Sequence, residues 1–361
     1  MIRIPIEAAA GRYLVMVGRG LLATTGELLR EAGLEGGLRL IADEAVYRLY
    51  GPDLEERLRS VGFSVASFQV PSGEPSKSLD MASRLYDWLI ESRTERKDLV
   101  LALGGGVVGD LAGFVAATYM RGVRLVQLPT TLLAQVDSSV GGKVAVDHPR
   151  GKNLIGAFHP PSLVIADPTV LASLPGRELR AAMAEVVKMG VILDADLFAR
   201  LEEEAEALLR LEVEPLEAVI ARGIELKARV VQEDEKESGP RAILNYGHTL
   251  GHAVEAVSGY LLYRHGESVA IGMVGAAMIA AEMGMVDRVV VDRQAVLLKR
   301  FGLPTSCSGM PVDRLLEAMG RDKKASRGRL TWVLPERIGH ASIRRDVPVK
   351  LVERVLLSLV A

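Results

Sequence analysis

The feature that most constrains the fold is a repeated alternation of short β-rich runs with helical patterns between residue 12 and about residue 168. The runs are YLVMV, LRLIA, LVLAL, RLVQL and LVIAD, and glycine-containing turns separate them from the helical segments. This rhythm is typical of a parallel β-sheet whose strands are connected through helices. The N-terminal part of the sequence therefore predicts an α/β domain with a parallel sheet.

After Pro175 the pattern changes to long segments that are rich in Ala, Leu, Glu and Arg and have helical spacing. The clearest of these segments are residues 179–190, 201–211 and 216–231. A chain of 361 residues also exceeds what one hydrophobic core usually serves. We therefore expect two domains, an α/β domain over residues 1–172 and an all-α domain over residues 173–361.

Composition excludes several classes of partner. Hydrophobic residues make up 49% of the chain, and 44 Lys and Arg nearly balance 46 Asp and Glu, which argues against disorder and against binding to nucleic acid or to a membrane surface.

Cys307 is the only cysteine, so no intramolecular disulfide or cysteine-based zinc site can form, and a reducing cytoplasm is expected. The first residues lack the features of a signal peptide, and the apolar run at 269–280 is too short to span a bilayer. We expect small-molecule partners and a buried helix at 269–280.

A glycine-rich loop follows the predicted buried strand at 99–103. Its residues are Gly104, Gly105, Gly106, Val107, Val108, Gly109 and Asp110. Adjacent glycines let a pyrophosphate approach the backbone, and the start of the following helix supplies N–H donors. The loop matches G-x-G-x-x-G, but it follows a late strand and no acidic residue lies about twenty residues downstream, so it fails as a Rossmann fingerprint. It predicts either phosphate binding or only a tight turn. Asp43, after the strand at 38–42, is a better ribose candidate, and it fits a helix N-cap equally well.

Three of the six histidines, His248, His252 and His265, fall within eighteen residues. His248 and His252 are spaced i, i+4, so on a helix both imidazoles project from one face, where one or both could bind zinc. Position 249 is Thr, so the pair is not H-E-x-x-H, and histidines with ordinary core hydrogen bonds are the alternative interpretation. Glu185 would complete a His, His, Glu set with an open coordination position, the pattern of a catalytic zinc. For Glu185 the alternative is a surface ion pair with Lys188.

Lysine is scarce beside arginine, with 11 lysines against 33 arginines, and its placement favours a functional use. Seven lysines lie in or beside polar motifs: Lys77, Lys143, Lys152, Lys188, Lys227, Lys323 and Lys324. The only two asparagines, Asn153 and Asn245, fall in GKN and LNYGH. Because a strongly hydrated point charge suits phosphate and carboxylate groups, this pattern predicts an anionic ligand.

Taken in chain order, nine motifs resemble those of the 3-dehydroquinate synthase family, and the resemblance covers nearly the whole chain. The motifs are SGEPSK (72–77), LGGGVVGD (103–110), MRGV (120–123), PTTLLAQVDSSVGGK (129–143), GKNLIGAFHP (151–160), AEVVK (184–188), LNYGHTLGH (244–252), HGE (265–267) and RDKK (321–324). The resemblance implies a Rossmann-like, NAD-binding N-terminal domain with a parallel sheet, a C-terminal helical metal-binding domain, a cleft between them and a homodimer.

The resemblance also implies a role for each matching residue. The implied ligands of a Zn2+ ion, or alternatively Co2+, are Glu185, His248 and His265. The implied NAD contacts are Asp43, Glu74, Lys77, Gly105, Gly106, Val107, Val108, Gly109, Asp110, Thr130, Thr131, Asp137, Lys143 and Lys152. The residues implied to act at the substrate are Lys143, Lys152, Asn153, Lys188, Lys227, Arg241, Asn245, His252, Lys323 and Lys324. Arg121 would reach the substrate phosphate of the neighbouring subunit, and a surface arginine in a turn is its alternative interpretation.

The substrate implied by the resemblance is 3-deoxy-D-arabino-heptulosonate 7-phosphate, an anionic sugar phosphate of the shikimate pathway. The implied reaction oxidises the C5 hydroxyl transiently, eliminates phosphate, reduces C5 again and closes 3-dehydroquinate by an intramolecular aldol addition. NAD is therefore returned unchanged. A metal at the C5 oxygen would favour the oxidation and polarise the ketone, while lysines would bind the anionic groups.

Three other functions compete with this interpretation. A polyol dehydrogenase of the glycerol dehydrogenase type would share the two-domain plan and release NADH, but the lysine-rich polar motifs argue against it. Another sugar phosphate cyclase, making an inosose or valiolone, is expected to alter the carboxylate-binding positions, whereas Lys227, Arg241 and Asn245 match the dehydroquinate pattern. A nucleotide sensor without catalytic activity would not need the metal ligands.

Overall fold

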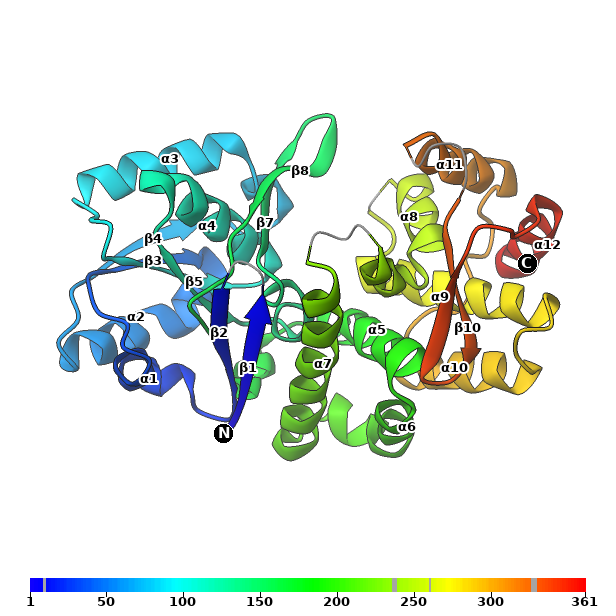
Figure 1. Cartoon of the computed structure of the whole chain (residues 1–361), viewed down its shortest axis with the longest axis horizontal. Coiled ribbons are helices and arrows are strands. Elements are labelled where there is room, and N and C mark those ends of the chain that lie inside the picture. Colours follow the sequence, from blue (N-terminus) through cyan, green and yellow to red (C-terminus); the bar gives the residue numbers. More distant parts are fainter. Residues whose placement is uncertain (9–10, 236–238, 260, 326–329) are drawn as a thin grey trace. The chain divides into compact units, whose positions relative to one another are not determined.

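The computed structural model of the chain describes residues 1–8, 11–235, 239–259, 261–325 and 330–361, and the side chains of all of these except 321–325. The chain divides into two compact units (Figure 1). The first consists of Met1–Leu174 and Leu216–Glu235, and the second of Pro175–Pro215 and Lys236–Ala361. Among the described residues, no helix combines the length and apolar character needed to cross a membrane.

The first unit is built on a seven-stranded sheet with the strand order β1-β2-β9-β6-β5-β3-β4. Its strands are β1 (Ile2–Ala8), β2 (Gly11–Val17), β3 (Leu38–Asp43), β4 (Val65–Val70), β5 (Leu99–Gly104), β6 (Arg124–Pro129) and β9 (Leu163–Ala166). β1 pairs antiparallel with β2, and the other neighbours pair in parallel. The five predicted β-rich runs fall on β2, β3, β5, β6 and β9, so the predicted parallel α/β sheet is confirmed.

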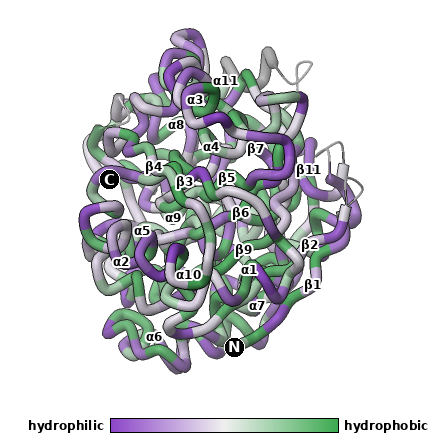
Figure 2. Tube along the Cα trace, turned by 90° about the vertical axis from the view of Figure 1, so that its left-hand side faces the viewer, coloured by the Kyte–Doolittle hydropathy of each residue, from purple (hydrophilic) through white to green (hydrophobic). Residues whose placement is uncertain are grey.

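Two hydrophobic cores lie on the two faces of this sheet. The helices of the first unit are α1 (Thr25–Glu31), α2 (Glu44–Ser60), α3 (Leu79–Glu91), α4 (Gly106–Thr118) and most of α7 (Val213–Glu233). On β3, Leu40 packs with α1 and α2 in one core, whereas Ile41 packs with α3 and α4 in the other. Successive side chains of a strand point to opposite faces, so a strand buried on both sides appears as a continuous apolar run. These runs are coloured mainly hydrophobic in Figure 2.

The order of the strands changes direction between β3 and β5. From β3 the chain moves to β4 on one side, and then it returns to β5 on the other side of β3. In open parallel sheets, ligands bind outside the carboxyl ends of the strands at such a point. Asp43 ends β3 and Gly104 ends β5, and a Cβ on Gly104 would lie 3.4 Å from Cβ of Asp43. The two features selected from the sequence therefore lie together at this edge.

A separate two-stranded antiparallel sheet in the first unit carries several of the predicted polar residues. It consists of β7 (Lys143–His148) and β8 (Gly151–Phe158). The backbone N–H of Asp147 in β7 donates to the carbonyl of Lys77, at 2.8 Å. This bond ties the small sheet to the SGEPSK segment.

The described part of the second unit is helical apart from a hairpin of β10 (Trp332–Arg337) and β11 (His340–Arg344). Its helices are α5 (Gly176–Leu193), α6 (Ala195–Leu209), α8 (His248–Val257), α9 (His265–Glu282), α10 (Arg288–Arg300), α11 (Val312–Ala325) and α12 (Val349–Val360). Most residues of α9 are buried, which confirms the predicted buried helix at 269–280. The predicted helical character of this half of the chain is also confirmed.

Neither unit is one continuous stretch of the sequence, because a single helical segment groups with the other half of the chain. The first cut lies between Leu174 and Pro175, but Leu216–Glu235, most of α7, groups with the first unit. Within that unit, Glu217 accepts a hydrogen bond from the backbone of Arg19 at 2.7 Å. Helical spacing identifies the apolar face of a helix but not the core that it joins. The division into a domain over residues 1–172 and a domain over residues 173–361 stays a prediction.

Candidate functional site

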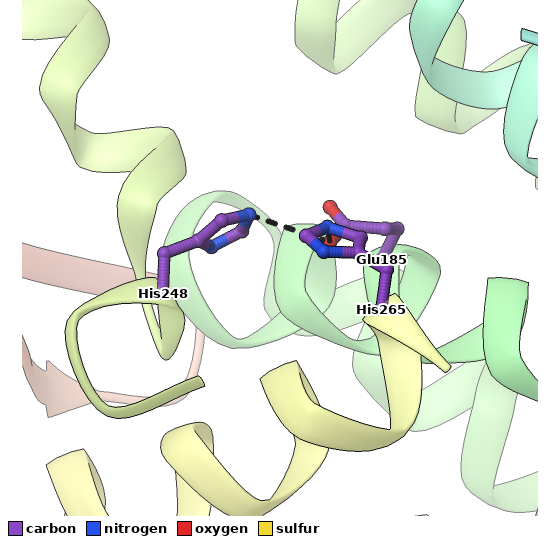
Figure 3. Close-up of side chains that lie close together, drawn as sticks. All are labelled: Glu185, His248 and His265. Atoms are coloured by element: carbon purple, nitrogen blue, oxygen red, sulfur yellow. Dashed lines mark ion pairs between the residues drawn. The ribbon is translucent and has the colours of Figure 1, made fainter. Parts of the chain in front are cut away.

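Glu185, His248 and His265 come from three helices of the second unit and converge at one point (Figure 3). Glu185 lies in the middle of α5, whereas His248 and His265 are the first residues of α8 and α9. Nε2 of His248 lies 3.7 Å from Oε1 of Glu185, and Nε2 of His265 lies 3.6 Å from the same oxygen. Two ligand atoms of a tetrahedral zinc lie about 3.3 Å apart, given bonds of about 2.0–2.1 Å. The three side chains are therefore spaced as a metal site requires.

Glu185 gives the site its electrostatic character. The residue is 2% exposed, and its Oε1 has no hydrogen-bond partner among the described residues. Lys188, one turn later on α5 and 3% exposed, forms an ion pair with Oε2, so the predicted pair exists but is not at the surface. Burial raises the pKa of Glu185, but Lys188 and the two imidazoles outweigh burial and hold that pKa well below its ordinary value. A charged, buried oxygen without a partner is unfavourable, so this donor set fits a metal cation.

Close helix packing in the second unit depends on glycine. A Cβ on Gly272 of α9 would lie 1.9 Å from the carbonyl oxygen of Gly247, which precedes α8. A Cβ on Gly266 would lie 1.8 Å from the carbonyl oxygen of Ala181 on α5. Larger residues at these positions would push α9 away from both neighbours. The glycines thus allow two imidazoles to reach a carboxylate on a third helix.

The two imidazoles are each held through Nδ1. Nδ1 of His248 lies 3.1 Å from the carbonyl oxygen of Tyr246, and Nδ1 of His265 lies 3.2 Å from Oε1 of Glu255. Burial lowers the pKa of His248 to about 4, which favours the neutral form that binds metals. For His265, burial lowers the pKa, but the nearby negative charges of Glu185 and Glu255 outweigh burial and raise it.

His252 lies beside the metal group without belonging to it. Its ring centroid lies 5.3 Å from that of His248 in an edge-to-face arrangement, as expected for an i, i+4 pair on a helix. His252 is exposed and forms a second possible ligand group with Glu255 and His265. Glu255 was missed from the sequence, although its spacing of seven residues from His248 on α8 places it on the same helical face.

In the first unit, the glycine-rich loop forms a tight turn from β5 into α4. Gly105 is the N-cap of α4, and no side chain caps this helix start. The first N–H groups of the helix are therefore available to an anion. Val108 is 1% exposed and packs in the core, so any contact that it makes with a nucleotide is through its backbone. Phosphate binding stays a prediction.

Neighbouring strand ends add polar groups to this edge. Asp43 is the N-cap of α2, and Oδ1 accepts from the backbone N–H groups of Ala45 and Val46 at 2.9 and 3.2 Å, which confirms the N-cap interpretation. Thr130, directly after β6, is 4% exposed, and its hydroxyl has no hydrogen-bond partner in the described parts of the chain. Thr131 Oγ1 accepts from a later backbone N–H. The structure places these groups where a nucleotide is predicted, and their roles stay predictions.

Charged side chains of the first unit form a connected cluster. Nζ of Lys77 lies 2.5 Å from Oδ2 of Asp110 and 2.5 Å from Oδ1 of Asn153. Burial raises the pKa of Asp110, with Lys77 opposing this effect. Separately, Lys152 pairs with Glu74 at 3.4 Å.

A second ion pair of the first unit links α7 to the segment after β6. Nζ of Lys227 lies 2.6 Å from both the carbonyl oxygen and Oδ1 of Asp137. Lys227 is 6% exposed and also contributes to the electrostatic environment of Asp110.

The remaining predicted residues vary in accessibility. Lys143, Lys152 and Asn153 are exposed in the two-stranded sheet. Arg241 is 3% exposed, whereas Asn245 at the end of the same short segment is exposed. Arg121 is exposed and has a φ of +66°, in a turn after α4. The side chains of Lys323 and Lys324 lie outside the described residues.

Comparison with known proteins identifies the family. The model described as 3-dehydroquinate synthase N-terminal matches residues 67–181, and the one described as 3-dehydroquinate synthase C-terminal matches residues 182–325. The 3-dehydroquinate synthase of Desulforamulus reducens is 48% identical over 345 residues, which cover 95% of this chain and 96% of that protein.

Two solved structures of sugar phosphate cyclases are similar over almost the whole chain. A 2-deoxy-scyllo-inosose synthase complexed with carbaglucose-6-phosphate, NAD+ and Co2+ is 28% identical, with a TM-score of 0.89 and coverage of 99% of this chain and 100% of that one. The 2-epi-5-epi-valiolone synthase of Streptomyces hygroscopicus, with NAD+ and Zn2+ bound, is 28% identical, with a TM-score of 0.88 and coverage of 96% of each chain. Identity is therefore markedly higher to the dehydroquinate synthase than to either of these cyclases. The chain belongs to the 3-dehydroquinate synthase family and is a lyase of aromatic amino acid biosynthesis.

Proposed function

We propose that the chain performs the 3-dehydroquinate synthase reaction with NAD held by the first unit and a divalent metal held by Glu185, His248 and His265 of the second. The observation that carries this proposal is that two imidazole nitrogens face a buried carboxylate oxygen that has no hydrogen-bond partner among the described residues. Three protein ligands of this kind leave a coordination position for a substrate. The two related cyclases solved with NAD+ and Co2+ or Zn2+ support this choice of cofactors.

The residues present fit both groups. When bound, NAD supplies a reversible hydride acceptor and the metal supplies a Lewis acid for the C5 oxygen of the substrate. The start of α4 offers backbone N–H groups to the pyrophosphate, and the buried hydroxyl of Thr130 offers a further hydrogen bond. Asp43, whose Oδ1 caps α2, offers its other oxygen to a ribose hydroxyl.

The cationic side chains bind and orient the anionic substrate. Lys188 holds a positive charge one turn from Glu185, where it stabilises negative charge next to the metal ligands. The exposed side chains of Lys143, Lys152 and Asn153 supply donors for phosphate or carboxylate oxygens. The departing phosphate accepts the C6 proton, so the main contribution of the protein is to hold the reacting groups in register.

The proposed substrate is 3-deoxy-D-arabino-heptulosonate 7-phosphate, and the proposed assembly is a homodimer in which Arg121 of one subunit serves the other. The lysine set argues for a ligand with more than one anionic group, which a polyol lacks. Asn245, Arg241 and Lys227 match the carboxylate-binding pattern of the family, which argues against a sugar phosphate that has no carboxylate.

The proposal is tested by incubating the purified protein with NAD, Zn2+ and the heptulosonate phosphate, and measuring inorganic phosphate and 3-dehydroquinate. We expect both products in equal amounts. Glucose 6-phosphate, which has no carboxylate, serves as the control substrate and should release no phosphate. If the heptulosonate phosphate is left intact, or if glucose 6-phosphate is converted instead, the proposed substrate is wrong.

A further inference from the structure

We propose that Glu255 is a positioning residue of the metal centre, which holds His265 in the tautomer whose Nε2 faces Glu185. Glu255 lies on α8, seven residues after His248, and its side chain is 14% exposed. Its Oε1 is 3.2 Å from Nδ1 of His265, which starts α9. The inference rests on the metal site of the proposed function, and it adds a residue that has no part in the ligand set.

The two nitrogens of His265 are divided between two carboxylates. Nδ1 faces Glu255 at 3.2 Å, whereas Nε2 faces Oε1 of Glu185 at 3.6 Å. An ionised carboxylate only accepts hydrogen bonds, so Glu255 requires a proton on Nδ1. A neutral imidazole then carries its lone pair on Nε2. The metal-binding nitrogen is thus the one directed at Glu185.

The two ring nitrogens of His248 are also directed at two different acceptors, one of which is a backbone carbonyl. Nδ1 of His248 donates to the carbonyl oxygen of Tyr246 at 3.1 Å, and its Nε2 faces Oε1 of Glu185 at 3.7 Å. A backbone carbonyl also only accepts, so it selects the same tautomer. No substitution removes a backbone carbonyl, but Glu255 can be replaced. The hydrogen bond between His265 and Glu255 is therefore the one that a substitution can test.

His252, Glu255 and His265 form a second possible ligand group, and chemistry makes the two groups mutually exclusive. A neutral imidazole has one lone-pair nitrogen, so His265 serves one metal through one nitrogen. Burial favours the group with Glu185, whose carboxylate is 2% exposed and has an oxygen without a hydrogen-bond partner in the described chain. His252 is exposed to solvent, so burial gives no comparable reason for a cation in the second group. Glu255 therefore acts on the ring and not on the metal.

The expected consequence is an effect on metal affinity. A carboxylate that accepts the Nδ1 proton fixes the orientation of the ring and raises the basicity of the other nitrogen. Loss of such a partner typically weakens metal binding by about 10-fold to 100-fold. Glu255→Gln keeps an acceptor oxygen but loses the negative charge, so its effect should be smaller than that of Glu255→Ala.

The experiment measures the Zn2+ dissociation constant of the full chain by competition with a chromogenic chelator, together with metal stoichiometry and the melting temperature of the metal-free protein. Glu282→Ala is the matched control, because Glu282 lies at the far end of α9 and makes an exposed ion pair with Arg354 at 2.9 Å. We expect one Zn2+ per wild-type chain, an affinity about 10-fold to 100-fold lower in Glu255→Ala, an intermediate value in Glu255→Gln and no change in Glu282→Ala.

Several results would overturn the inference. Wild-type affinity in Glu255→Ala would show that the hydrogen bond does not matter. A stoichiometry of two that drops to one in Glu255→Ala would make Glu255 a ligand of a second metal. Equal losses in the alanine and glutamine variants, with equal losses in melting temperature, would indicate a merely structural role. Failure of the wild type to bind any Zn2+ would instead refute the metal site of the proposed function and, with it, this inference.

Discussion

Lys188 and Glu185 lie one turn apart on α5 and form an ion pair although both residues are almost fully buried. The pair leaves Oε1 of Glu185 to the two imidazoles. Buried pairs of this kind are weak evidence for stability, because desolvation of two charges offsets their attraction. A functional use of both charges explains their presence in the interior better than stability does.

His248→Ala should abolish turnover and reduce bound zinc from about one equivalent to almost none, because loss of one of three protein ligands typically strips a catalytic zinc. Glu185→Gln should do the same, with a lower melting temperature because Lys188 loses its charged partner. Metal analysis after dialysis, with phosphate release measured in parallel, checks both expectations. His252→Ala is the matched control and should retain its zinc. The ligand assignment fails if the two ligand variants keep their zinc or if only the control loses it.

Turnover of the heptulosonate phosphate should cause no lasting rise in NADH absorbance at 340 nm. The hydride removed from C5 is returned within the same cycle, so the cofactor ends each cycle oxidised. The measurement follows absorbance and phosphate release in one sample. Accumulation of NADH in proportion to product would instead assign the chain to the polyol dehydrogenases.

Arg121→Ala should raise the KM for the substrate sharply if this side chain binds the substrate phosphate. If Arg121 is only an exposed arginine in a turn, its replacement should be nearly neutral, as most surface substitutions are. Steady-state kinetics with varied substrate concentration distinguish the two outcomes.

A mixing experiment tests whether Arg121 acts in the neighbouring subunit. Equal amounts of Arg121→Ala and Lys188→Ala subunits are combined under conditions where dimers exchange, at a substrate concentration far below the raised KM, where neither parent dimer is active. In a mixed dimer, one site has Lys188 and borrows Arg121 from the partner, and the other site lacks both groups. Random pairing makes half of the dimers mixed, so activity should recover to about one quarter of the wild-type value. An absence of recovery despite proven exchange argues that Arg121 does not act across subunits.

Asp98→Ala should destabilise the protein far more than Asp53→Ala. Asp98 pairs with Arg39 at 2.9 Å, both side chains are less than a tenth exposed, and its other oxygen accepts from the N–H of Gly37 at 2.8 Å. Removing one partner of a buried pair costs about 3–5 kcal/mol, since the remaining charge is left buried. Asp53 pairs with Arg57 in solvent, where a pair contributes about 1 kcal/mol or less. Urea-induced unfolding of both variants measures the difference, and equal effects would contradict this account.

Local pattern was sufficient for much of the fold. The five β-rich runs are buried on both faces of the sheet, and this double burial produces apolar runs that can be recognised without knowledge of the partner strands. The long helical segments after Pro175 and the buried helix at 269–280 were visible for a similar reason, because helical periodicity depends only on residues within a few turns. The pairing of α7 with the first unit was not visible, because that grouping depends on contacts between distant segments.

The same distinction applies to the candidate site. The sequence alone determined which side chains are available, since the spacing of His248 and His252 and the scarcity of lysine are properties of the chain itself. The resemblance to the family already implied His265, and not His252, as a ligand beside Glu185. Only the tertiary structure decided that Lys188 is buried and that Glu255 holds the ring of His265. Glu185 and His265 are 80 residues apart in sequence, and they meet because glycines let α9 pack closely against α5 and α8. The sequence shows where the glycines are, but it does not show which helices they bring into close contact. That contact forms only when the helices pack against one another.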